Sequence, residues 1–243
     1  MLLNCDLGES YGSWSMGLDE EVMPFIDQAN IACGFHAGDP VTIHKTLELA
    51  SKHNVSITAH PSYPDLVGFG RRSMKLDQME LYTAIQYQIS ALDGMASCQN
   101  LSISSVKPHG ALYNDMMSDH SIRKTVMEAV ASYCKPLTLI LLSTSDSELH
   151  RREADRENLE LMFEAFADRA YTDSGKLVSR KEPNAVHSHA GMLDQVKQLC
   201  EDGTVTTANK IALPLRCDTL CVHGDNMTAV EAIREIRTII SQE

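Results

Sequence analysis

The sequence predicts an α/β fold: one parallel (β/α) barrel domain that spans residues 1–243. Two observations lead to this prediction. Short apolar runs alternate with amphipathic segments along the chain, and ionisable residues beside Gly or Pro follow several of those runs. Parallel barrels build their active sites from the loops at the carboxyl ends of their strands. A chain of 243 residues suits a single domain of this kind.

Seven segments have the length and the apolar content of buried strands. They are residues 2–5, 28–33, 55–58, 103–107, 137–142, 159–163 and 218–222. The unbroken apolar run from Leu137 to Leu142 is typical of a strand that is covered on both faces. Residues 170–186 look like a loop, although this region could contain one more strand.

Helices are expected where apolar residues recur every three or four positions. One begins at Asp39-Pro40, an N-cap followed by a proline in the first turn. Another follows Asp77 and Glu80, which resemble a capping box. Further helices are expected over residues 120–133, 188–202 and 226–241. The loop of residues 61–73 is too long for a simple connection and is a candidate functional loop.

Composition restricts the partners and the compartment. The net charge of -12 argues against nucleic acid or an anionic membrane as a main partner, but it does not exclude an anionic small-molecule substrate. No stretch has the apolar length of a membrane span, and the N-terminus does not resemble a secretion signal. Seven cysteines without a CxxC pair indicate a reduced, cytoplasmic protein.

One segment carries the clearest chemical signal. Residues 106–110, Val-Lys-Pro-His-Gly, bring a lysine and a histidine from a strand into a turn. Four other predicted strands end in a similar way. The corresponding segments are residues 4–9, 30–39, 59–61 and 221–225.

The chain resembles the LamB/YcsF family over essentially its whole length. Seven motifs carry this resemblance: residues 4–9, 30–39, 59–61, 68–72, 107–114, 166–169 and 221–225. The resemblance implies a glycoside hydrolase/deacetylase-like distorted TIM barrel of seven strands. It also implies ATP-dependent hydrolysis of 5-oxoproline (pyroglutamate) to L-glutamate by a 5-oxoprolinase complex. The partners would then be the separate B and C subunits of that complex.

Opening an unstrained lactam requires activation of the amide, a base for water, an acid for the leaving nitrogen and cations for the carboxylate. The catalytic candidates are Asp6, His36, His60, Lys107 and His109. Metal-dependent deacetylases of the related barrel superfamily use an Asp-His-His set, so Asp6, His60 and His109 are also candidate ligands of a divalent metal. Alternatively, they are pocket residues without a metal, and a histidine is the acid or the base.

Candidate substrate-binding residues lie in the 61–73 loop and near strand ends. Arg71 and Arg72 have planar donors that suit a carboxylate or a phosphoryl group. The others are Asn30, Tyr113, Asn114, Glu164, Asp168, Arg169, His223 and Asp225. Structural alternatives exist for some of these: an internal bridge between Asp168 and Arg169, and capping of the last helix by Asp225. Glu9 and Asp39 are weaker candidates, because Asp39 is explained as an N-cap.

ATP is implied only by the resemblance. Neither GxxxxGK[ST] nor GxGxxG occurs in the sequence, so ATP binds either at another kind of site or on a partner subunit. Two other functions stay open. One is a metal-dependent deacetylase of an N-acetylated sugar, and the other is a non-catalytic, small-acid-binding regulatory subunit.

Overall fold

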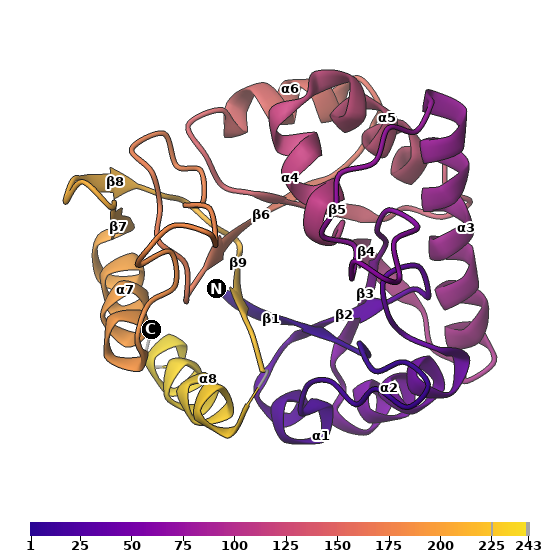
Figure 1. The fold of residues 1–243 in the computed structure, drawn as a ribbon, viewed down its shortest axis with the longest axis horizontal. Coiled ribbons are helices and arrows are strands. Elements are labelled where there is room, and N and C mark those ends of the chain that lie inside the picture. The colour runs from indigo at the N-terminus through magenta and orange to yellow at the C-terminus, as the bar shows by residue number, and fades with distance from the viewer. Residues whose placement is uncertain (225, 242–243) are drawn as a thin grey trace.

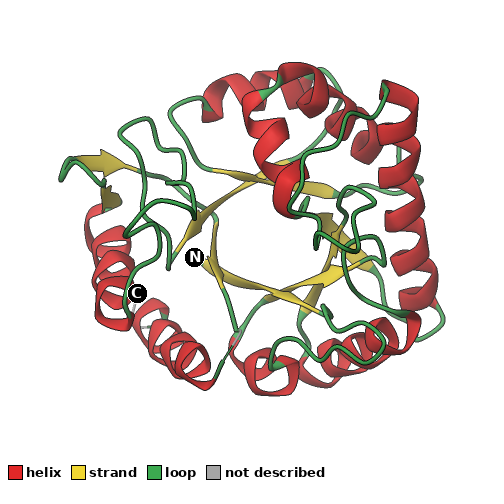
Figure 2. Cartoon of the chain, in the orientation of Figure 1, coloured by secondary structure: helices red, strands yellow, loops and turns green. Residues whose placement is uncertain are grey.

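Seven parallel strands close into a barrel inside a ring of helices (Figures 1 and 2). The computed structural model describes residues 1–224 and 226–241. The barrel strands are β1 Leu2–Leu7, β2 Gln28–Ala32, β3 Ser56–His60, β4 Ile103–Val106, β5 Thr138–Leu142, β6 Leu161–Phe166 and β9 Thr219–Val222. They neighbour one another in chain order, and β9 pairs with both β6 and β1 to close the ring. The predicted seven-stranded parallel barrel is confirmed.

Helices cover the outside of the barrel (Figure 2). They are α1 Asp19–Val22, the 3-10 helix η1 Met23–Phe25, α2 Pro40–His53, α3 Gln78–Ser97, α4 Gly110–Ser118, α5 His120–Ala131, α6 Ser147–Asp155, α7 His189–Asp202 and α8 Met227–Ile240. In Figure 1, α3 runs beside α5, and α7 runs beside α8. Among the described residues, no helix has both the length and the apolar character needed to cross a membrane.

Two predicted helix starts are confirmed by their capping bonds. The Asp39 carboxylate accepts from the backbone N–H groups of Val41 and Thr42 at 2.8 and 3.0 Å. Asp77 and Glu80 form the expected capping box. Each cap satisfies N–H groups that the first helical turn leaves without a partner.

The structure differs from the sequence prediction in several places. It contains helices α4 and α6, which the sequence patterns do not predict. It also contains an antiparallel hairpin of β7 Thr204–Thr206 and β8 Ala212–Pro214, which is not predicted either and lies outside the barrel (Figure 1). Strand β6 starts and ends later than the predicted 159–163. Residues 170–186 form isolated bridges but no strand, so they do not supply an eighth.

The centre of the barrel is polar. Asn4 donates to Thr219 Oγ1 at 2.9 Å and accepts from Asn30 at 2.8 Å, and the hydroxyls of Thr58 and Ser105 are 2.6 Å apart. Parallel barrels are usually filled by branched apolar side chains. Here the inward-facing residues are polar instead. Because residues two apart on a strand share a face, this polar network lies on the same face as the residues at the carboxyl ends of the strands, directly beneath them.

Candidate functional site

Lys107, the first residue after β4, lies at the centre of a buried group of polar side chains. Its ammonium nitrogen is 2.9 Å from Glu164 Oε2 and 3.2 Å from Asp6 Oδ1. The same nitrogen donates to Asn4 Oδ1 and to Cys221 Sγ, each at 3.1 Å. Lys107 is only 2% exposed, and an ammonium has three donors. The side chain therefore has no donor left for a ligand.

The charges in this group stabilise one another. Although burial lowers it, Asp6 and the other neighbours raise the pKa of Lys107 well above its usual range. Burial raises the pKa of Asp6, but the neighbouring charges, that of Lys107 first, outweigh burial and hold that pKa well below its usual range. Asp6 Oδ1 also accepts from Asn30 at 2.8 Å. Asp6 is therefore held as a carboxylate beside an ammonium.

Three buried histidines form a second group, next to Asp6. His36 follows β2, His60 ends β3, and His109 precedes α4. His60 Nε2 lies 3.0 Å from His109 Nδ1, and the two rings are nearly perpendicular, at 87°. The ring of His36 instead stacks on that of His109, with centroids 3.8 Å apart and planes 4° from parallel.

Glu9 adds a carboxylate to the histidine group. Its Oε1 lies 3.4 Å from His36 Nε2 and 3.6 Å from His109 Nδ1. Burial, followed by the charge of Asp6, raises the pKa of Glu9. Burial also lowers the pKa of His36 and of His109 well below the usual range. The surroundings of this group therefore disfavour isolated charge.

The predicted metal ligands are only partly brought together. His60 and His109 face each other. The potential metal-ligand atoms that lie close to both of them belong to Glu9 and His36, and the ligand atoms of these four residues all lie within 4.8 Å of one another. The carboxylate of Asp6 groups instead with Cys221 and His223, also within 4.8 Å. Asp6 thus lies between the histidine group and a third group at the end of β9.

That third group contains Asp168 and His223. Asp168 Oδ2 lies 3.0 Å from His223 Nδ1, and Arg180 Nη2 lies 3.4 Å from His223 Nε2. Burial lowers the pKa of His223, but Asp168 and then Asp6 outweigh burial and raise that pKa. The ring of Phe166 stacks on His223. His223 is therefore held in place and favoured in its protonated form.

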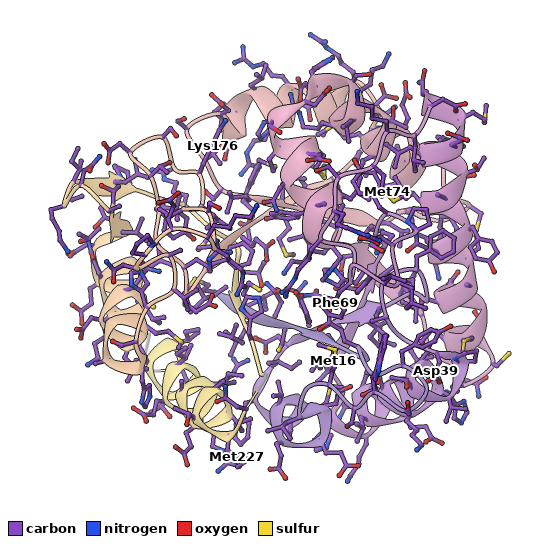
Figure 3. All side chains as sticks on the ribbon, viewed as in Figure 1. Met16, Asp39, Phe69, Met74, Lys176 and Met227 are labelled. Atoms are coloured by element: carbon purple, nitrogen blue, oxygen red, sulfur yellow. The ribbon has the colours of Figure 1, made fainter. Side chains whose placement is uncertain are left out.

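The loop of residues 61–73 covers the histidine group. Gly70 has φ +64°, and a Cβ at this position would lie 2.8 Å from His109 Cδ2. At Gly110, with φ +58°, a Cβ would lie 2.5 Å from the carbonyl oxygen of Gly70. Only glycine tolerates both the left-handed backbone and this close approach. These two glycines let the loop pack directly on the histidines, and the ring of Phe69 in the same loop (labelled in Figure 3) meets that of His109 edge-on.

The two arginines of this loop have different surroundings. Arg72 Nε donates to both carboxylate oxygens of Asp65 at 3.0 and 3.1 Å, and its Nη2 also donates to Asp65. Arg71 lies over the ring of Phe69 at 5.1 Å, is exposed, and takes part in no ion pair among the described residues. Arg72 therefore shapes the loop, whereas Arg71 is available to bind an anion.

Some predicted site residues have other roles or lie elsewhere. Arg169 donates to the backbone carbonyl oxygens of Val178 and Ala185, so it holds the 170–186 loop, and Asp168 pairs with His223 rather than with Arg169. Asn114 is exposed and donates to Gly110 O. The hydrogen bonds that Arg169 and Asn114 make in this structure therefore stabilise the local backbone, and a substrate contact of either residue stays a prediction.

The remaining predicted residues are Tyr113 and Asp225. Tyr113 is buried, and its ring meets that of Phe166 edge-on. Burial, followed by the neighbouring carboxylate of Glu164, raises the pKa of the Tyr113 hydroxyl well above its usual range. Its role as a residue that orients a ligand stays a prediction. Asp225 lies outside the described residues, and Asn226 is the N-cap of α8.

Sequence reasoning underrates or misses several residues of the site. It treats Glu9 as a weak candidate and gives Asn4 and Cys221 no partner. Their positions offer a signal, because Asn4 lies two residues before Asp6 and Cys221 two before His223, so each pair shares a strand face. Arg180 lies in an irregular loop, and no local pattern places it beside His223.

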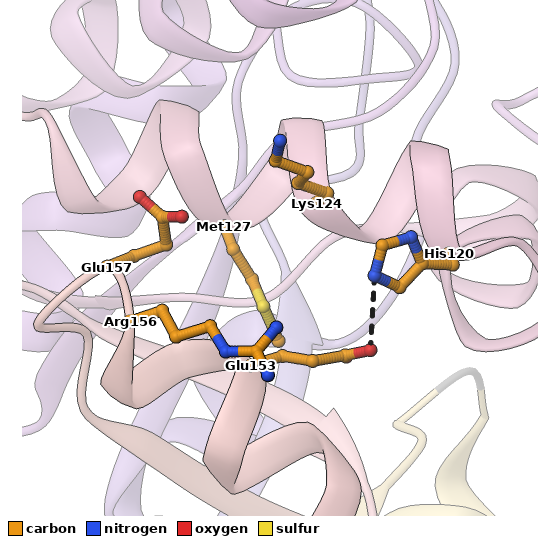
Figure 4. Close-up of a pocket in the computed structure, with 6 residues that line it drawn as sticks. All are labelled: His120, Lys124, Met127, Glu153, Arg156 and Glu157. Atoms are coloured by element: carbon orange, nitrogen blue, oxygen red, sulfur yellow. Dashed lines mark ion pairs between the residues drawn. The ribbon is translucent and has the colours of Figure 1, made fainter.

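Two pockets lie apart from these groups. A pocket of about 150 Å³ between α5 and α6 is lined by His120, Lys124, Met127, Glu153, Arg156 and Glu157 (Figure 4). A hollow of about 970 Å³ lies between the 8–17 loop and α2, and Met16 and Asp39 in Figure 3 both line it. Its charged lining residues are Asp19, Glu20, Glu21, Asp39 and Lys45. This acidic excess makes the hollow unfavourable for a nucleotide phosphate.

Comparison with known proteins places the chain in a family. The LamB/YcsF family model matches residues 1–243. The chain belongs to the LamB/YcsF family. Relatives include a protein from Vibrio cholerae serotype O1 that is named as the A subunit of 5-oxoprolinase and is 52% identical over 241 residues, covering 99% of this chain and 97% of the relative. A Pseudomonas fluorescens (strain Pf0-1) protein of the same name is 50% identical over 244 residues, covering 100% and 98%.

A solved structure of similar fold supports the membership. The crystal structure of the lactam utilization protein from Thermus thermophilus matches with a TM-score of 0.91 and 37% identity, covering 100% of this chain and 96% of that one. The LamB/YcsF barrel seen here is therefore shared with a protein whose name refers to lactams. That name agrees with the substrate class of the two curated relatives.

Proposed function

We propose that this chain is the A subunit of a 5-oxoprolinase, which hydrolyses the lactam of 5-oxoproline to L-glutamate with ATP. The names of relatives at 50–52% identity over nearly the full length support the substrate. The observation that carries the chemistry is the pairing of Asp6 and His223. A carboxylate oxygen of Asp6 and a ring nitrogen of His223 lie within 4.8 Å of each other. The surroundings favour the ionised carboxylate of Asp6 and the protonated imidazole of His223.

Lactam hydrolysis needs both states at the same place. A base accepts a proton from the water that attacks the carbonyl carbon, and an acid protonates the nitrogen that leaves. Asp6 is the base, since Lys107 keeps it ionised, and its Oδ2 lies on the side of His60, 3.4 Å from Nε2. His223 is the acid, and Asp168 supports its positive charge. The two reacting atoms of an amide are bonded to each other, so one substrate can lie against both residues.

Arg71 binds the carboxylate of 5-oxoproline. It is exposed beside the histidine group, and its guanidinium has no carboxylate partner among the described residues, unlike that of Arg72. A charge-assisted, bidentate contact would fix the orientation of the lactam ring. Lys107 does not bind the substrate in this mechanism, because its donors are already in use. It keeps Asp6 ionised and in position.

ATP and the partner subunits are also part of the proposal. An amide is a poor electrophile, and transfer of the terminal phosphoryl group of ATP to its oxygen, with release of ADP, would make the carbon reactive. Addition of water and cleavage of the C–N bond would then leave an acyl phosphate, which a second water would hydrolyse to glutamate and inorganic phosphate. The chain lacks the common phosphate-binding motifs, and the large hollow is acidic. We therefore assign ATP binding to the complex with the B and C subunits, acting in the cytoplasm.

The test measures glutamate and ADP released from 5-oxoproline. The chain is assayed alone and with the B and C subunits, which are first shown to be active with the corresponding chain of a curated relative. We expect ATP-dependent glutamate only from the mixture, and we expect His223→Gln to abolish it. The control His120→Gln, in the pocket of Figure 4, should retain full activity. If active partners release no glutamate with this chain, the proposal is wrong and a deacetylase becomes the leading alternative.

A further inference from the structure

The hydrogen bonds of His60 and His109 fix where their protons lie. His60 Nδ1 is 2.5 Å from the carbonyl oxygen of Lys107, and His109 Nε2 is 3.0 Å from the carbonyl oxygen of Phe69. A carbonyl oxygen only accepts, so each of these nitrogens must carry a hydrogen. A neutral imidazole has one N–H and one lone pair. The lone pairs of both rings are therefore on the nitrogens that face each other.

Those two nitrogens, His60 Nε2 and His109 Nδ1, are only 3.0 Å apart. Two lone pairs at this distance repel each other unless a cation lies between them. The cation is either a proton, which would satisfy this pair alone, or a metal ion, which would also accept further donors. The neighbouring groups distinguish these two possibilities.

Other potential metal-ligand atoms surround this pair of nitrogens. Glu9 Oε1 and both ring nitrogens of His36 are buried and have no hydrogen-bond partner in the described part of the chain. Glu9 Oε1 lies 3.6 Å from His109 Nδ1. Tetrahedral ligands at the usual zinc distances of about 2.0–2.1 Å are separated by about 3.3 Å. The separations of 3.0 and 3.6 Å lie on either side of this value.

We propose that Glu9, His60 and His109 bind one divalent transition-metal ion, such as Zn²⁺. Backbone carbonyls orient the two histidines through their other nitrogens, which is a common arrangement for a metal-bound imidazole. His36 stacks parallel to His109, so in this orientation its lone pair does not converge with that of His109, and it is not assigned as a ligand. Three protein ligands leave a position open, as in catalytic zinc sites.

This inference deepens the proposed function, because the ligands lie beside Asp6. A divalent ion bound there would polarise a carbonyl oxygen or acidify a bound water. Metal binding can nevertheless be measured without turnover. If the chain binds the metal ion but forms no glutamate with active B and C subunits, this inference is supported and the proposed function is refuted. If the metal-free complex forms glutamate, a catalytic metal is refuted and the proposed function is unaffected.

The experiment uses the full-length chain stripped with a chelator. Co²⁺ is added while its visible absorption is followed, and Zn²⁺ affinity is measured by calorimetry. We expect one ion per chain, bound through nitrogen and oxygen ligands. We also expect Glu9→Gln and His109→Gln to weaken Zn²⁺ binding by about 100-fold or more. Circular dichroism of each metal-free variant checks that it is folded.

The control is His44→Gln, which alters an exposed histidine paired with Glu48 on α2 and should bind like the unaltered protein. Three results would overturn the proposal. They are no Zn²⁺ binding at micromolar concentration, equal binding by folded His109→Gln, and thiolate absorption bands that place Co²⁺ on cysteines. In the first case a shared proton, rather than a metal, lies between the two histidines.

Discussion

Replacing Lys107 with methionine tests the electrostatics of the barrel centre. The substitution keeps an unbranched apolar side chain that ends at the Cε position, and it removes the ammonium that lies within 3.2 Å of both Asp6 and Glu164. At an effective dielectric constant of about 20, each of these contacts contributes about 5 kcal/mol of attraction, before desolvation is subtracted. Removing one partner of a buried ion pair typically lowers the free energy of unfolding by about 3–5 kcal/mol.

We therefore expect Lys107→Met to lower the free energy of unfolding by about 3–5 kcal/mol, measured by urea denaturation at neutral pH. Activity should fall as well, because Asp6 loses the charge that keeps it ionised. The double variant Lys107→Met with Glu164→Gln removes one of the two uncompensated carboxylates. It should recover part of the stability but none of the activity.

The stability measurement decides the outcome. If Lys107→Met unfolds at the same urea concentration as the unaltered protein, the buried ammonium does not stabilise the barrel. If the variant is stable and fully active, the assignment of Asp6 as a base supported by Lys107 is also refuted. The control is Lys124→Met, which alters an exposed lysine on α5 and should change the free energy of unfolding by less than about 0.5 kcal/mol.

Three further predictions concern other parts of the molecule. Arg71→Gln should raise KM for 5-oxoproline by about tenfold, equivalent to about 1.4 kcal/mol. Arg72→Gln should instead mainly lower stability. Equal KM values for Arg71→Gln and the unaltered protein would exclude Arg71 from the binding site. Gly70→Ala should lower the free energy of unfolding by about 1–3 kcal/mol and also disturb His109; a thermal-melting midpoint that does not change would show that the loop can yield. The pKa of Glu153 is lowered by the Arg123 guanidinium, so its ionised form stabilises the folded state above the usual glutamate pKa of about 4.3, and this contribution is lost as the pH falls through the lowered value. Glu153→Gln should therefore be less stable than the unaltered protein at about pH 7, and the difference should shrink as the pH falls below about 4.3. A pH-independent difference would contradict this.

Local sequence patterns are sufficient for the barrel. The apolar runs predict its seven strands, and Asp39 and Asp77 mark two helix starts, because caps and side-chain periodicity depend on residues that are near in sequence. Helix α4 is not predicted because it begins at Gly110, and glycine normally disfavours a helix. Gly110 is needed at this position because the backbone of Gly70 leaves no room for a side chain. Gly70 lies far from Gly110 in the chain, so this reason cannot be read locally.

The sequence by itself determined which residues reach the mouth of the barrel, because the carboxyl ends of parallel strands all lie at the same end. Only the tertiary structure decided how these residues pair. It joined Asp168 to His223 rather than to Arg169, gave Arg72 to Asp65, and surrounded Lys107 with carboxylates. Pairing depends on distances across the barrel and on burial, which sets the balance between desolvation and attraction for each charge. Neither quantity can be read from the spacing of residues along the chain.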